Sequence, residues 1–364
     1  MRLVVTGGGT GGHVYPAIEV ALAARDQGAD VEYLGSRRGQ EKSICGKVNL
    51  PIRTYGSEPV YRLHTIRGMK SLLNLLRSSG EAKRDLEKIR PDVIFATGGY
   101  SAAPVLNAAR KLRIPVVLHE QNSVPGRTIL LASRSAQTVC TVFHASAQHF
   151  PKGKVQRTGM PIRKAMRESA QGRLLLDAGA MKAAPLVLVM GGSQGSAALN
   201  DHALGTALRM ASTEVQWLHL TGLSHFESTM NSLQKMGIRS DYTIKAYVEG
   251  DEMASAMFNA SVALCRSGAG TMAELAAFRK PSVLVPYPAA FNDHQRINAE
   301  EFVNLGAAEI IAQKDLDPAR IESRVLSWLN DSDRVEAAQK ALAEWDVPDA
   351  VPQILGMIKS AAGR

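Results

Sequence analysis

The chain has 364 residues, of which 45% are hydrophobic and 21% are charged. That composition is typical of a folded globular protein and excludes a long disordered tail, and the length favours two domains. Lys and Arg number 43 against 34 Asp and Glu, a formal charge of +9 that favours an anionic partner. Because the basic residues are scattered and aromatic residues make up only 5% of the chain, we do not expect nucleic acid to be that partner.

Three cysteines, Cys45, Cys140 and Cys265, lie far apart and form no CxxC pair. This spacing predicts neither a disulfide framework nor a zinc site, and it fits a reducing compartment. The opening sequence MRLVVTGGGTGG enters a strand and a glycine loop at once, so no secretion signal is expected. Since no apolar run approaches the roughly 18 to 20 residues that span a bilayer, we expect a cytoplasmic protein whose contact with any membrane is peripheral.

Short apolar runs of β-forming residues alternate with amphipathic helical stretches along the whole chain. This alternation predicts an α/β protein with parallel sheets covered by helices. The first half contains six expected strands, Leu3–Thr6, Val31–Leu34, Ile52–Tyr55, Val93–Ala96, Val116–Leu118 and Thr138–Thr141. The second half repeats the cycle with five, Leu186–Met190, Val215–Leu220, Tyr242–Ala246, Val262–Cys265 and Val283–Val285. The chain therefore consists of two similarly built halves.

Each half has a glycine loop after its first strand. GGGTGG at residues 7–12 leads into a helical run expected near Pro16, and GGSQG at residues 191–195 repeats the arrangement. Glycines let a ligand approach the backbone, and helix N-termini offer unpaired N–H groups to anions. Two such loops facing each other predict a cleft that holds a diphosphate. Neither loop has the GxGxxG spacing of a dinucleotide dehydrogenase, and a tight turn without a ligand is the alternative.

The boundary between the halves is expected in RTGMPIR, residues 157–163, where Gly159 and Pro161 break regular structure. We therefore assign residues 1–158 to a first domain and residues 159–345 to a second. Residues 346–364 contain a helical stretch, Val351–Ile358, whose apolar spacing requires a surface to cover it. This helix is expected to pack back on the first domain.

The segment Tyr61–Arg90 combines apolar and basic residues at helical spacing. Its members are Ile66, Met69, Leu72, Leu73, Leu75 and Leu76 with Arg62, Arg67, Lys70, Arg77, Lys83 and Arg84. A basic amphipathic helix can lie in an anionic membrane surface. The alternative is a helix that packs its leucines into the domain core, and the two interpretations can coexist.

Seven motifs follow one another along the chain: GGGTGGHVYPA, ATGGYSAAP, HEQNSVPG, TGMPIR, GGSQGS, CRSGAGTMAEL and NDHQRINA. In content and order they resemble the MurG family, the UDP-N-acetylglucosamine:lipid-linked muramyl-pentapeptide N-acetylglucosaminyltransferases of peptidoglycan synthesis. The resemblance extends from Gly7 to Ala299. It implies a GT-B architecture, in which two Rossmann-like domains face a deep cleft, with the acceptor on the first domain and the UDP-sugar mainly on the second.

The implied reaction transfers N-acetylglucosamine from UDP-N-acetylglucosamine, with inversion, to the C4 hydroxyl of undecaprenyl-pyrophosphoryl-MurNAc-pentapeptide. The implied location is the cytoplasmic face of the inner membrane, with the anionic membrane surface and cell-wall synthesis or division proteins as partners. Two other classes remain open. One is a related GT-B enzyme, such as a glycolipid synthase or a UDP-sugar epimerase, and the other is a non-catalytic membrane-bound scaffold.

The resemblance also implies a set of contacts to UDP-N-acetylglucosamine. The guanidinium of Arg163 suits a diphosphate, and the carboxylate of Glu274 suits ribose hydroxyls. For Glu274 the alternative is an ordinary carboxylate in the first turn of a helix. Gln295, with Asn292 and Asp293 nearby, is similar to the set that reads the sugar hydroxyls. The full implied set is Thr10, Gly11, Gly12, Asn122, Arg163, Ser193, Val248, Ala269, Gly270, Thr271, Met272, Ala273, Glu274 and Gln295.

His13 matches the histidine that follows the first glycine loop in the family, where a neutral imidazole could take the proton of the acceptor hydroxyl. It could equally hold the loop by hydrogen bonding. Glu120 and its neighbour His119, both in HEQN, are the reserve catalytic candidates, although either could instead stabilise its loop. The resemblance implies that no metal is obligatory.

Two DxD sequences, residues 315–317 and 331–333, resemble metal-binding motifs by letter only. They lie in the late helical region of the chain and are interpreted as helix caps or solvated turns. The sequence departs from the family pattern at Met160, where asparagine is usual, and at Ala103, where glycine is usual.

Overall fold

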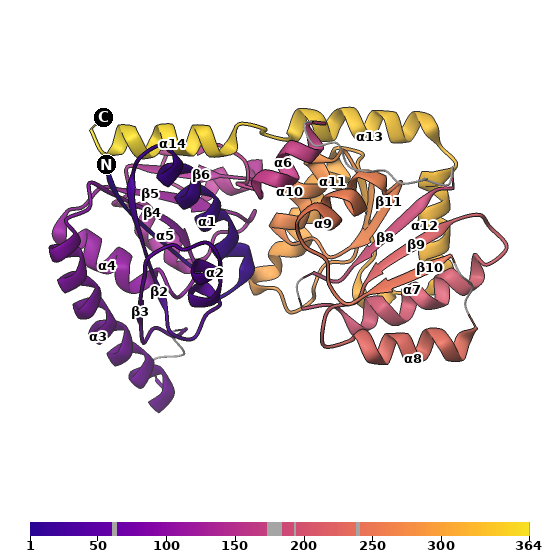
Figure 1. The fold of residues 1–364 in the computed structure, drawn as a ribbon, viewed down its shortest axis with the longest axis horizontal. Helices are drawn as coiled ribbons and strands as arrows, with labels where there is room; N and C mark the ends of the chain where they lie inside the picture. The colour runs from indigo at the N-terminus through magenta and orange to yellow at the C-terminus, as the bar shows by residue number, and fades with distance from the viewer. Residues whose placement is uncertain (60–63, 173–183, 193, 238–240, 364) are drawn as a thin grey trace. The chain divides into compact units, whose positions relative to one another are not determined.

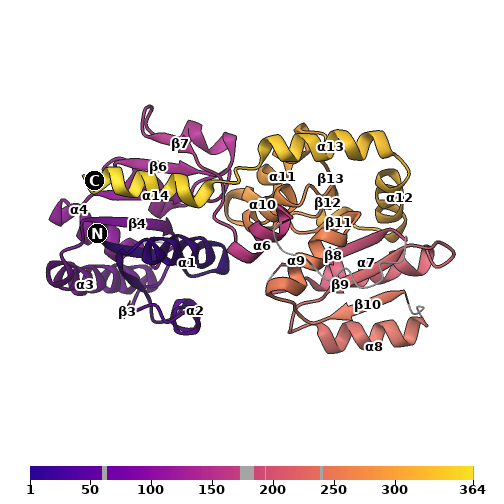
Figure 2. The same ribbon diagram turned by 45° about the horizontal axis from the view of Figure 1, so that its top comes forward.

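The computed structural model describes residues 1–59, 64–172, 184–192, 194–237 and 241–363. They form two compact units, Met1–Arg163 with Asp349–Arg364, and Lys164–Pro348. Each unit contains one parallel sheet flanked by helices (Figures 1 and 2). The expected α/β class, with two similarly built halves, is confirmed.

The sheet of the first unit has the strand order β3-β2-β1-β4-β5-β6-β7. All its strand pairs are parallel. Its strands are β1 Arg2–Gly7, β2 Asp30–Ser36, β3 Ile52–Tyr55, β4 Val93–Gly98, β5 Val116–Glu120, β6 Thr138–Thr141 and β7 Val155–Arg157. Its helices are α1 Gly11–Asp26, α2 Glu41–Lys47, α3 Ile66–Ile89, α4 Ala103–Leu112, α5 Arg127–Ser133 and α14 Ala350–Ala361, with the 3₁₀ turn η1 His144–His149.

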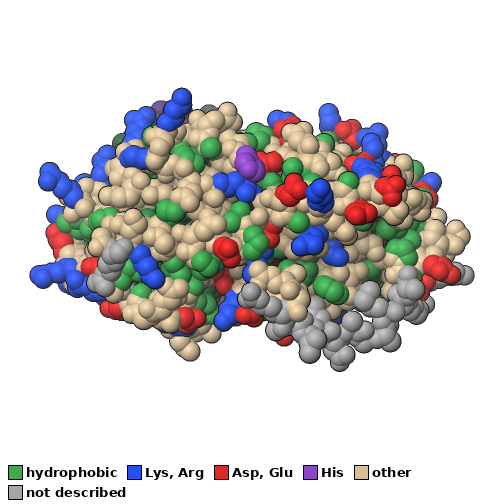
Figure 3. All heavy atoms as spheres, turned by 90° about the horizontal axis from the view of Figure 1, so that it is seen from above, with side chains coloured by type: hydrophobic (Ala, Val, Ile, Leu, Met, Phe, Trp, Pro, Cys, Tyr) green, Lys and Arg blue, Asp and Glu red, His purple; other side chains and the backbone are tan. Residues whose placement is uncertain are grey.

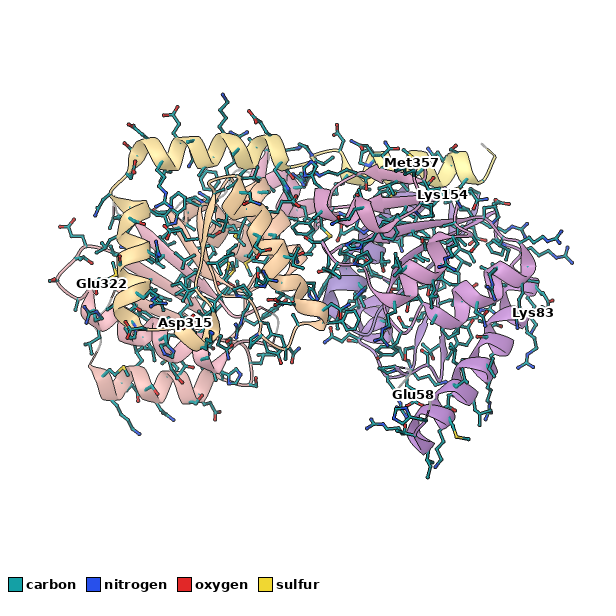
Figure 4. The ribbon with its side chains drawn as sticks, turned by 180° about the vertical axis from the view of Figure 1, so that it is seen from behind. Glu58, Lys83, Lys154, Asp315, Glu322 and Met357 are labelled. Carbon is teal, nitrogen blue, oxygen red and sulfur yellow. The ribbon has the colours of Figure 1, made fainter. Side chains whose placement is uncertain are left out.

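Two hydrophobic clusters cover the two faces of this sheet. One joins β1 and β4 to α1 and to the C-terminal helix α14, whose Ile354, Leu355 and Ile358 are buried in it. The other joins the opposite side chains of the same strands to α3, α4 and α5. The C-terminal helix, on which Figure 4 labels Met357, therefore completes the core of the unit that begins the chain.

The sheet of the second unit has the order β10-β9-β8-β11-β12-β13, again parallel throughout. Its strands are β8 Leu186–Met190, β9 Gln216–Leu220, β10 Tyr242–Lys245, β11 Val262–Cys265, β12 Ser282–Leu284 and β13 Ala308–Ile310. Its helices are α6 Lys164–Ala170, α7 Ala197–Arg209, α8 Phe226–Met236, α9 Gly250–Asn259, α10 Ala269–Ala277, α11 His294–Asn304, α12 Pro318–Leu329 and α13 Ser332–Trp345, with the 3₁₀ turns η2 Phe291–Asp293 and η3 Gln313–Asp315.

All eleven expected strands are present, and β7 and β13 are additional. The chain leaves the first unit after Arg163, a few residues beyond the expected boundary at 158. The N–H groups of Thr158 and Gly159 explain the difference, because both donate to Thr141 O at the end of β6. The chain re-enters the first unit at Asp349 rather than at residue 346.

The first helix was expected near Pro16 but begins at Gly11, so that prediction is wrong. Pro16 lies inside α1, where it removes the hydrogen bond that residue 16 would otherwise donate one turn back. The glycine loop therefore ends sooner than its composition indicates. The cap interpretation of the DxD sequences is confirmed for Asp317 and Asp331, whose carboxylates accept from the first N–H groups of α12 and α13.

Candidate functional site

Each sheet has one place where neighbouring strands lead to helices on opposite faces. It lies between β1 and β4 in the first unit and between β8 and β11 in the second. In open parallel sheets, ligands bind beyond the carboxyl ends of the strands at such a switch point. The two glycine loops follow β1 and β8, so each unit has one candidate edge.

In the first unit, the glycine loop is tied to the loop that follows β4. Gly8 N–H donates to Gly98 O at 3.1 Å, and the hydroxyl of Thr97 donates to the backbone oxygen of His13 at 2.8 Å. Gly99 has φ +78°, and a Cβ at this position would lie 2.0 Å from Gly8 O. The two loops thus meet at a distance that only glycine allows.

A buried carboxylate lies beneath this glycine loop. Glu41 is 0% exposed, and its Oε1 accepts from Gly9 N–H at 3.1 Å. The amide of Gly9 is therefore already used inside the protein, which leaves the loop with fewer donors for an anion than its glycine count indicates. The sequence carried no signal for Glu41, since its partner is distant in the chain.

His13 is the third residue of α1 and is partly exposed. Its Nδ1 lies 3.0 Å from the hydroxyl oxygen of Thr10, the N-cap residue, whose side chain makes no cap hydrogen bond. The pair has two possible states. When Nδ1–H donates to Thr10, the lone pair is on Nε2, and when Thr10 donates, Nε2 carries the hydrogen. Thr10 and His13, with Gly11 and Gly12 between them, form one turn at this edge.

Glu120 is buried and holds the loop after β5. One carboxylate oxygen accepts from Asn122 N–H at 2.9 Å and the other accepts from Gly126 N–H at 3.0 Å. Burial raises the pKa of Glu120 to about 7, although these hydrogen bonds favour the charged form. Glu120 is 2% exposed and faces its own loop, and the side chain of Asn122 also turns back toward this carboxylate. The geometry thus favours the loop-holding interpretation of Glu120.

His119 is fully buried, and its tautomer follows from its partners. A backbone oxygen can only accept, so Nε2 carries the hydrogen and donates to Gly159 O at 2.9 Å. Nδ1 then accepts from the side-chain amide of Gln121 at 3.0 Å. Burial lowers the pKa of His119 to about 4. Both ring nitrogens are occupied, so His119 ties β5 to the segment that leads out of the unit.

In the second unit, Ser193 lies outside the described residues, but the glycines on either side of it are described. Gly195 has φ +77°, and a Cβ there would lie 2.1 Å from Thr221 O. A Cβ on Gly191 would lie 2.5 Å from Ser196 N. The loop thus folds tightly against the end of β9, before α7 begins at Ala197.

The helix α10 begins at Ala269, with Gly268 as its N-cap, immediately after β11 and its short loop. The N–H groups of Ala269, Gly270 and Thr271 precede the first intrahelical bond, which Met272 N–H donates to Gly268 O. Ala269, Met272 and Ala273 are buried, so these side chains pack inside the second unit.

Glu274 lies in the second turn of α10, and the first turn contains no acidic residue. The alternative of a carboxylate in the first helical turn is therefore wrong. Glu274 is partly exposed.

Three further predicted residues lie at other places in the two units. Gln295 is in the first turn of α11, and its side-chain oxygen accepts from Tyr287 N–H at 3.0 Å. The hydroxyl of Ser267 donates to the backbone oxygen of Gln295 at 2.8 Å, which ties α11 to the loop before α10. Val248 is buried in the loop between β10 and α9. Arg163 is partly exposed at the end of the first unit.

Sequence reasoning missed Arg266, which lies between β11 and α10. Arg266 is 8% exposed, and its guanidinium donates to Ser196 Oγ, so it connects the N-cap of α7 to the segment before α10. The motif CRSGAGTMAEL contains this arginine, but nothing in the sequence indicates that it is buried.

The helix α3 turns its leucines outward. Ile66, Met69 and Leu73 are 77%, 61% and 65% exposed, and Leu72 and Leu76 are also exposed. The side chains that face the core are mostly small, as at Gly68, Ser71, Ser78, Ser79 and Ala82. Packing of this stripe into the core is therefore wrong for its first half, and Tyr61 and Arg62 lie outside the described residues. None of the described helices combines the length and the apolar character that a membrane span requires.

On the face shown in Figure 3, the Lys and Arg side chains form no single continuous patch, because Asp and Glu side chains lie on the same face. Within the described residues, no group of three or more His, Cys, Asp or Glu side chains is placed to hold a metal ion.

Comparison with known proteins defines the class of this chain. Residues 3–141 match the glycosyltransferase family 28 N-terminal domain, and residues 186–354 match the glycosyltransferase family 28 C-terminal domain. The first match includes the first glycine loop and the strands from β1 to β6, and the second includes the second glycine loop and the whole second sheet. The fold is thus that of a glycosyltransferase of the GT-B type.

Full-length relatives narrow this class. The chain is 32% identical to UDP-N-acetylglucosamine–N-acetylmuramyl-(pentapeptide) pyrophosphoryl-undecaprenol N-acetylglucosamine transferase 1 of Bacillus cereus, over 97% of both chains. It is equally identical to the enzyme of that name from Bacillus licheniformis, over 99% of this chain and 98% of the relative. The crystal structure of Acinetobacter baumannii MurG matches with a TM-score of 0.78 and 28% identity, over 99% of both chains. The chain belongs to the MurG family of glycosyltransferases.

Proposed function

We propose that this protein transfers N-acetylglucosamine from UDP-N-acetylglucosamine to the C4 hydroxyl of undecaprenyl-pyrophosphoryl-MurNAc-pentapeptide, which converts lipid I to lipid II. The observation that carries the proposal is the 32% identity, over 97% of both chains, to a relative that bears the name of this reaction. The glycine loops at both switch points support it, because a sugar nucleotide and an acceptor pyrophosphate both require close backbone approach. The glycolipid synthase and the epimerase are not favoured, since the full-length relatives are named for the transfer.

The test is release of UDP by the purified chain, with and without the lipid-linked acceptor. Acceptor-dependent release, together with a disaccharide product, is expected. Conversion of the UDP-sugar without acceptor would indicate an epimerase instead, and failure to bind the UDP-sugar would indicate a scaffold.

The donor contacts are proposed on the second unit. The first N–H groups of α10 would meet the diphosphate, Glu274 the ribose, the backbone at Val248 the uracil, and Gln295 the sugar. Support comes from the position of α10 at the switch point and from the partly exposed carboxylate of Glu274. Arg163 and the second glycine loop would add positive charge and donors near the phosphates.

We propose His13 as the general base. With Nδ1–H donating to Thr10, Nε2 would accept the proton of the acceptor hydroxyl as its oxygen bonds to the anomeric carbon and the bond to the UDP oxygen breaks. Attack from the face opposite the leaving group inverts the anomeric centre and needs no covalent intermediate on the protein. Glu120 would act indirectly, by holding the loop that carries Asn122.

We propose that the transfer needs no metal, because helix N-termini and basic side chains can offset the diphosphate charge. Activity in excess chelator is the measurement. Complete loss of turnover with EDTA, restored by Mg²⁺, would contradict this.

We propose peripheral binding to the cytoplasmic face of the inner membrane through the outward-facing stripe of α3, where Arg67, Lys70 and Arg77 are also exposed. Apolar contacts and basic side chains together bind anionic bilayers. L73S should weaken co-sedimentation with phosphatidylglycerol vesicles at low salt, whereas L223S, at an exposed leucine of the second unit, should not. Equal binding by both variants would contradict the proposal. Cell-wall synthesis or division proteins are the further partners that we propose.

A further inference from the structure

Arg266 is a buried arginine at the switch point of the second sheet. It is 8% exposed and directly follows β11. Its guanidinium donates to Ser196 Oγ at 2.7 Å and to Gln313 Oε1 at 2.6 Å, and to the backbone oxygens of Val285 and Pro286 at 3.0 and 3.1 Å. All four acceptors are uncharged, so they satisfy its hydrogen bonds but not its charge.

Among the residues that the structure describes, Arg266 makes no ion pair with a carboxylate. The side chain of Tyr287 lies against it, with the ring centre 5.6 Å from the guanidinium carbon. Burial lowers the pKa of Arg266, which reflects the cost of removing the charged group from water. A buried charge without a counter-ion destabilises a protein strongly unless an anion joins it.

The N-termini of two helices, which carry partial positive charge, lie close to Arg266 in the chain or in its contacts. Ser196, which accepts from Arg266, is the N-cap of α7, and its hydroxyl also accepts from Leu199 N–H. Gly268, two residues after Arg266, is the N-cap of α10. Helix N-termini carry partial positive charge and disfavour a nearby cation. Neither helix has an acidic residue in its first turn that would offset it.

The first unit has the opposite charge beneath its similar loop. There the buried group is the carboxylate of Glu41, which accepts from Gly9 N–H. The two loops are alike in glycine content, yet the first contacts the side chain of Glu41, and the residue that follows the second contacts the guanidinium of Arg266. Charge therefore distinguishes the loops where glycine spacing does not.

We propose that Arg266 is a charge-positioning residue, which supplies the buried positive charge for the donor's diphosphate and fixes Ser196 and the Pro286 turn around it. This inference rests on the proposed function, because the diphosphate of the UDP-sugar is the anion concerned. It extends that function by naming the side chain whose charge favours binding of a diphosphate over binding of an uncharged nucleoside. A residue that only supported the fold would contribute equally to the affinities for uridine and UDP, whereas this role predicts a selective contribution to the affinity for UDP.

The experiment compares the affinities of the purified full chain for uridine and for UDP by isothermal titration calorimetry. The variant R266M should lower the affinity for UDP by about 10- to 100-fold, since a buried charge near a dianion is weakly screened. Its affinity for uridine should change by less than about threefold, because uridine carries no phosphate. R266K keeps the charge and should retain most of the preference for UDP.

The matched control is R209M, which removes a charge from the C-terminal end of α7, where Arg209 pairs with Glu322. Figure 4 labels Glu322. It should leave the ratio of the UDP and uridine affinities unchanged. Equal loss of both affinities in R266M, or no change in either, would overturn the inference while the proposed function stands. If R266M does not fold, R266Q, which keeps hydrogen bonding without charge, decides by the same ratio. A wild-type protein that prefers uridine to UDP would overturn the proposed function, and the inference with it.

Discussion

Thr10 and His13 are the two side chains on which the proposed chemistry depends most directly. When Nδ1–H of His13 donates to Thr10 across their 3.0 Å contact, Nε2 is the ring nitrogen that accepts a proton. H13A should lower kcat by about 10²- to 10⁴-fold, the usual contribution of a general base. Steady-state kinetics at saturating substrates measure this, and near-normal turnover would exclude His13 as the base.

The hydroxyl of Thr10 can be tested separately from the imidazole. T10V keeps the shape of the side chain but removes the acceptor for Nδ1–H, so it should lower kcat by roughly tenfold or more. T10S keeps the hydroxyl and should remain close to wild type. The pH profile of kcat is the second measurement, because loss of this hydrogen bond should move its acidic limb. Identical profiles for T10V and T10S would exclude a role in setting the tautomer.

At the scale of elements, the two loops of the first candidate edge are held together by glycine. A Cβ at Gly99 would lie 2.0 Å from Gly8 O, and its φ of +78° is strained for any other residue. G99A should therefore destabilise the first unit by about 1 to 3 kcal/mol and abolish most activity. Thermal unfolding and turnover measure the two effects.

Gly126 provides the control for that substitution, because it also lies in a loop of the first unit and its N–H supports Glu120. Its φ is −67°, and a Cβ there meets no atom of the described residues within 4 Å. G126A keeps the N–H, so both stability and turnover should stay near wild type. A larger loss in G126A than in G99A would show that close approach of the loops is not what selects glycine.

Elements also show where sequence reasoning succeeds. Runs such as Leu186–Met190 were predicted because four or five apolar residues in succession have few alternatives to a buried strand. The strand β7, with the sequence Val-Gln-Arg, is too short and too polar for that signal and exists because β6 offers it a partner. Glu41 and Arg266 could not be predicted as buried supports, since their partners come from distant parts of the chain.

At the scale of the whole molecule, the two units contain buried ionisable groups that respond differently to acid. In the first unit, burial lowers the pKa of His119 to about 4 and raises that of Glu120 to about 7. In the second unit, burial lowers the pKa of His219 to about 3, and its neighbours Asn200 and Tyr242 are uncharged. The second unit lacks a described counterpart to Glu120 with an upward shift of this kind.

The direction of each pKa shift decides which unit loses more stability in acid. A histidine with a lowered folded pKa binds fewer protons in the native state, so its unit loses stability as the pH falls below about 6.5. A carboxyl with a raised folded pKa acts in the opposite sense, and its unit gains stability as the pH falls from about 7 toward 4.5. His119 and Glu120 therefore largely offset each other in this window, whereas His219 acts alone. The second unit should therefore lose more stability than the first on acidification.

Tryptophan fluorescence separates the two units, because Trp217, Trp328 and Trp345 all lie in the second. Between pH 7 and 5, the denaturation midpoint followed by fluorescence should fall further than the midpoint followed by far-UV circular dichroism, because circular dichroism reports both units. H219Q removes the imidazole and should reduce the pH dependence of the unfolding free energy followed by fluorescence by on the order of 2 kcal/mol across these two pH units. Equal slopes for H219Q and wild type would show that His219 is protonated in the native state at pH 5, in conflict with its burial among uncharged partners.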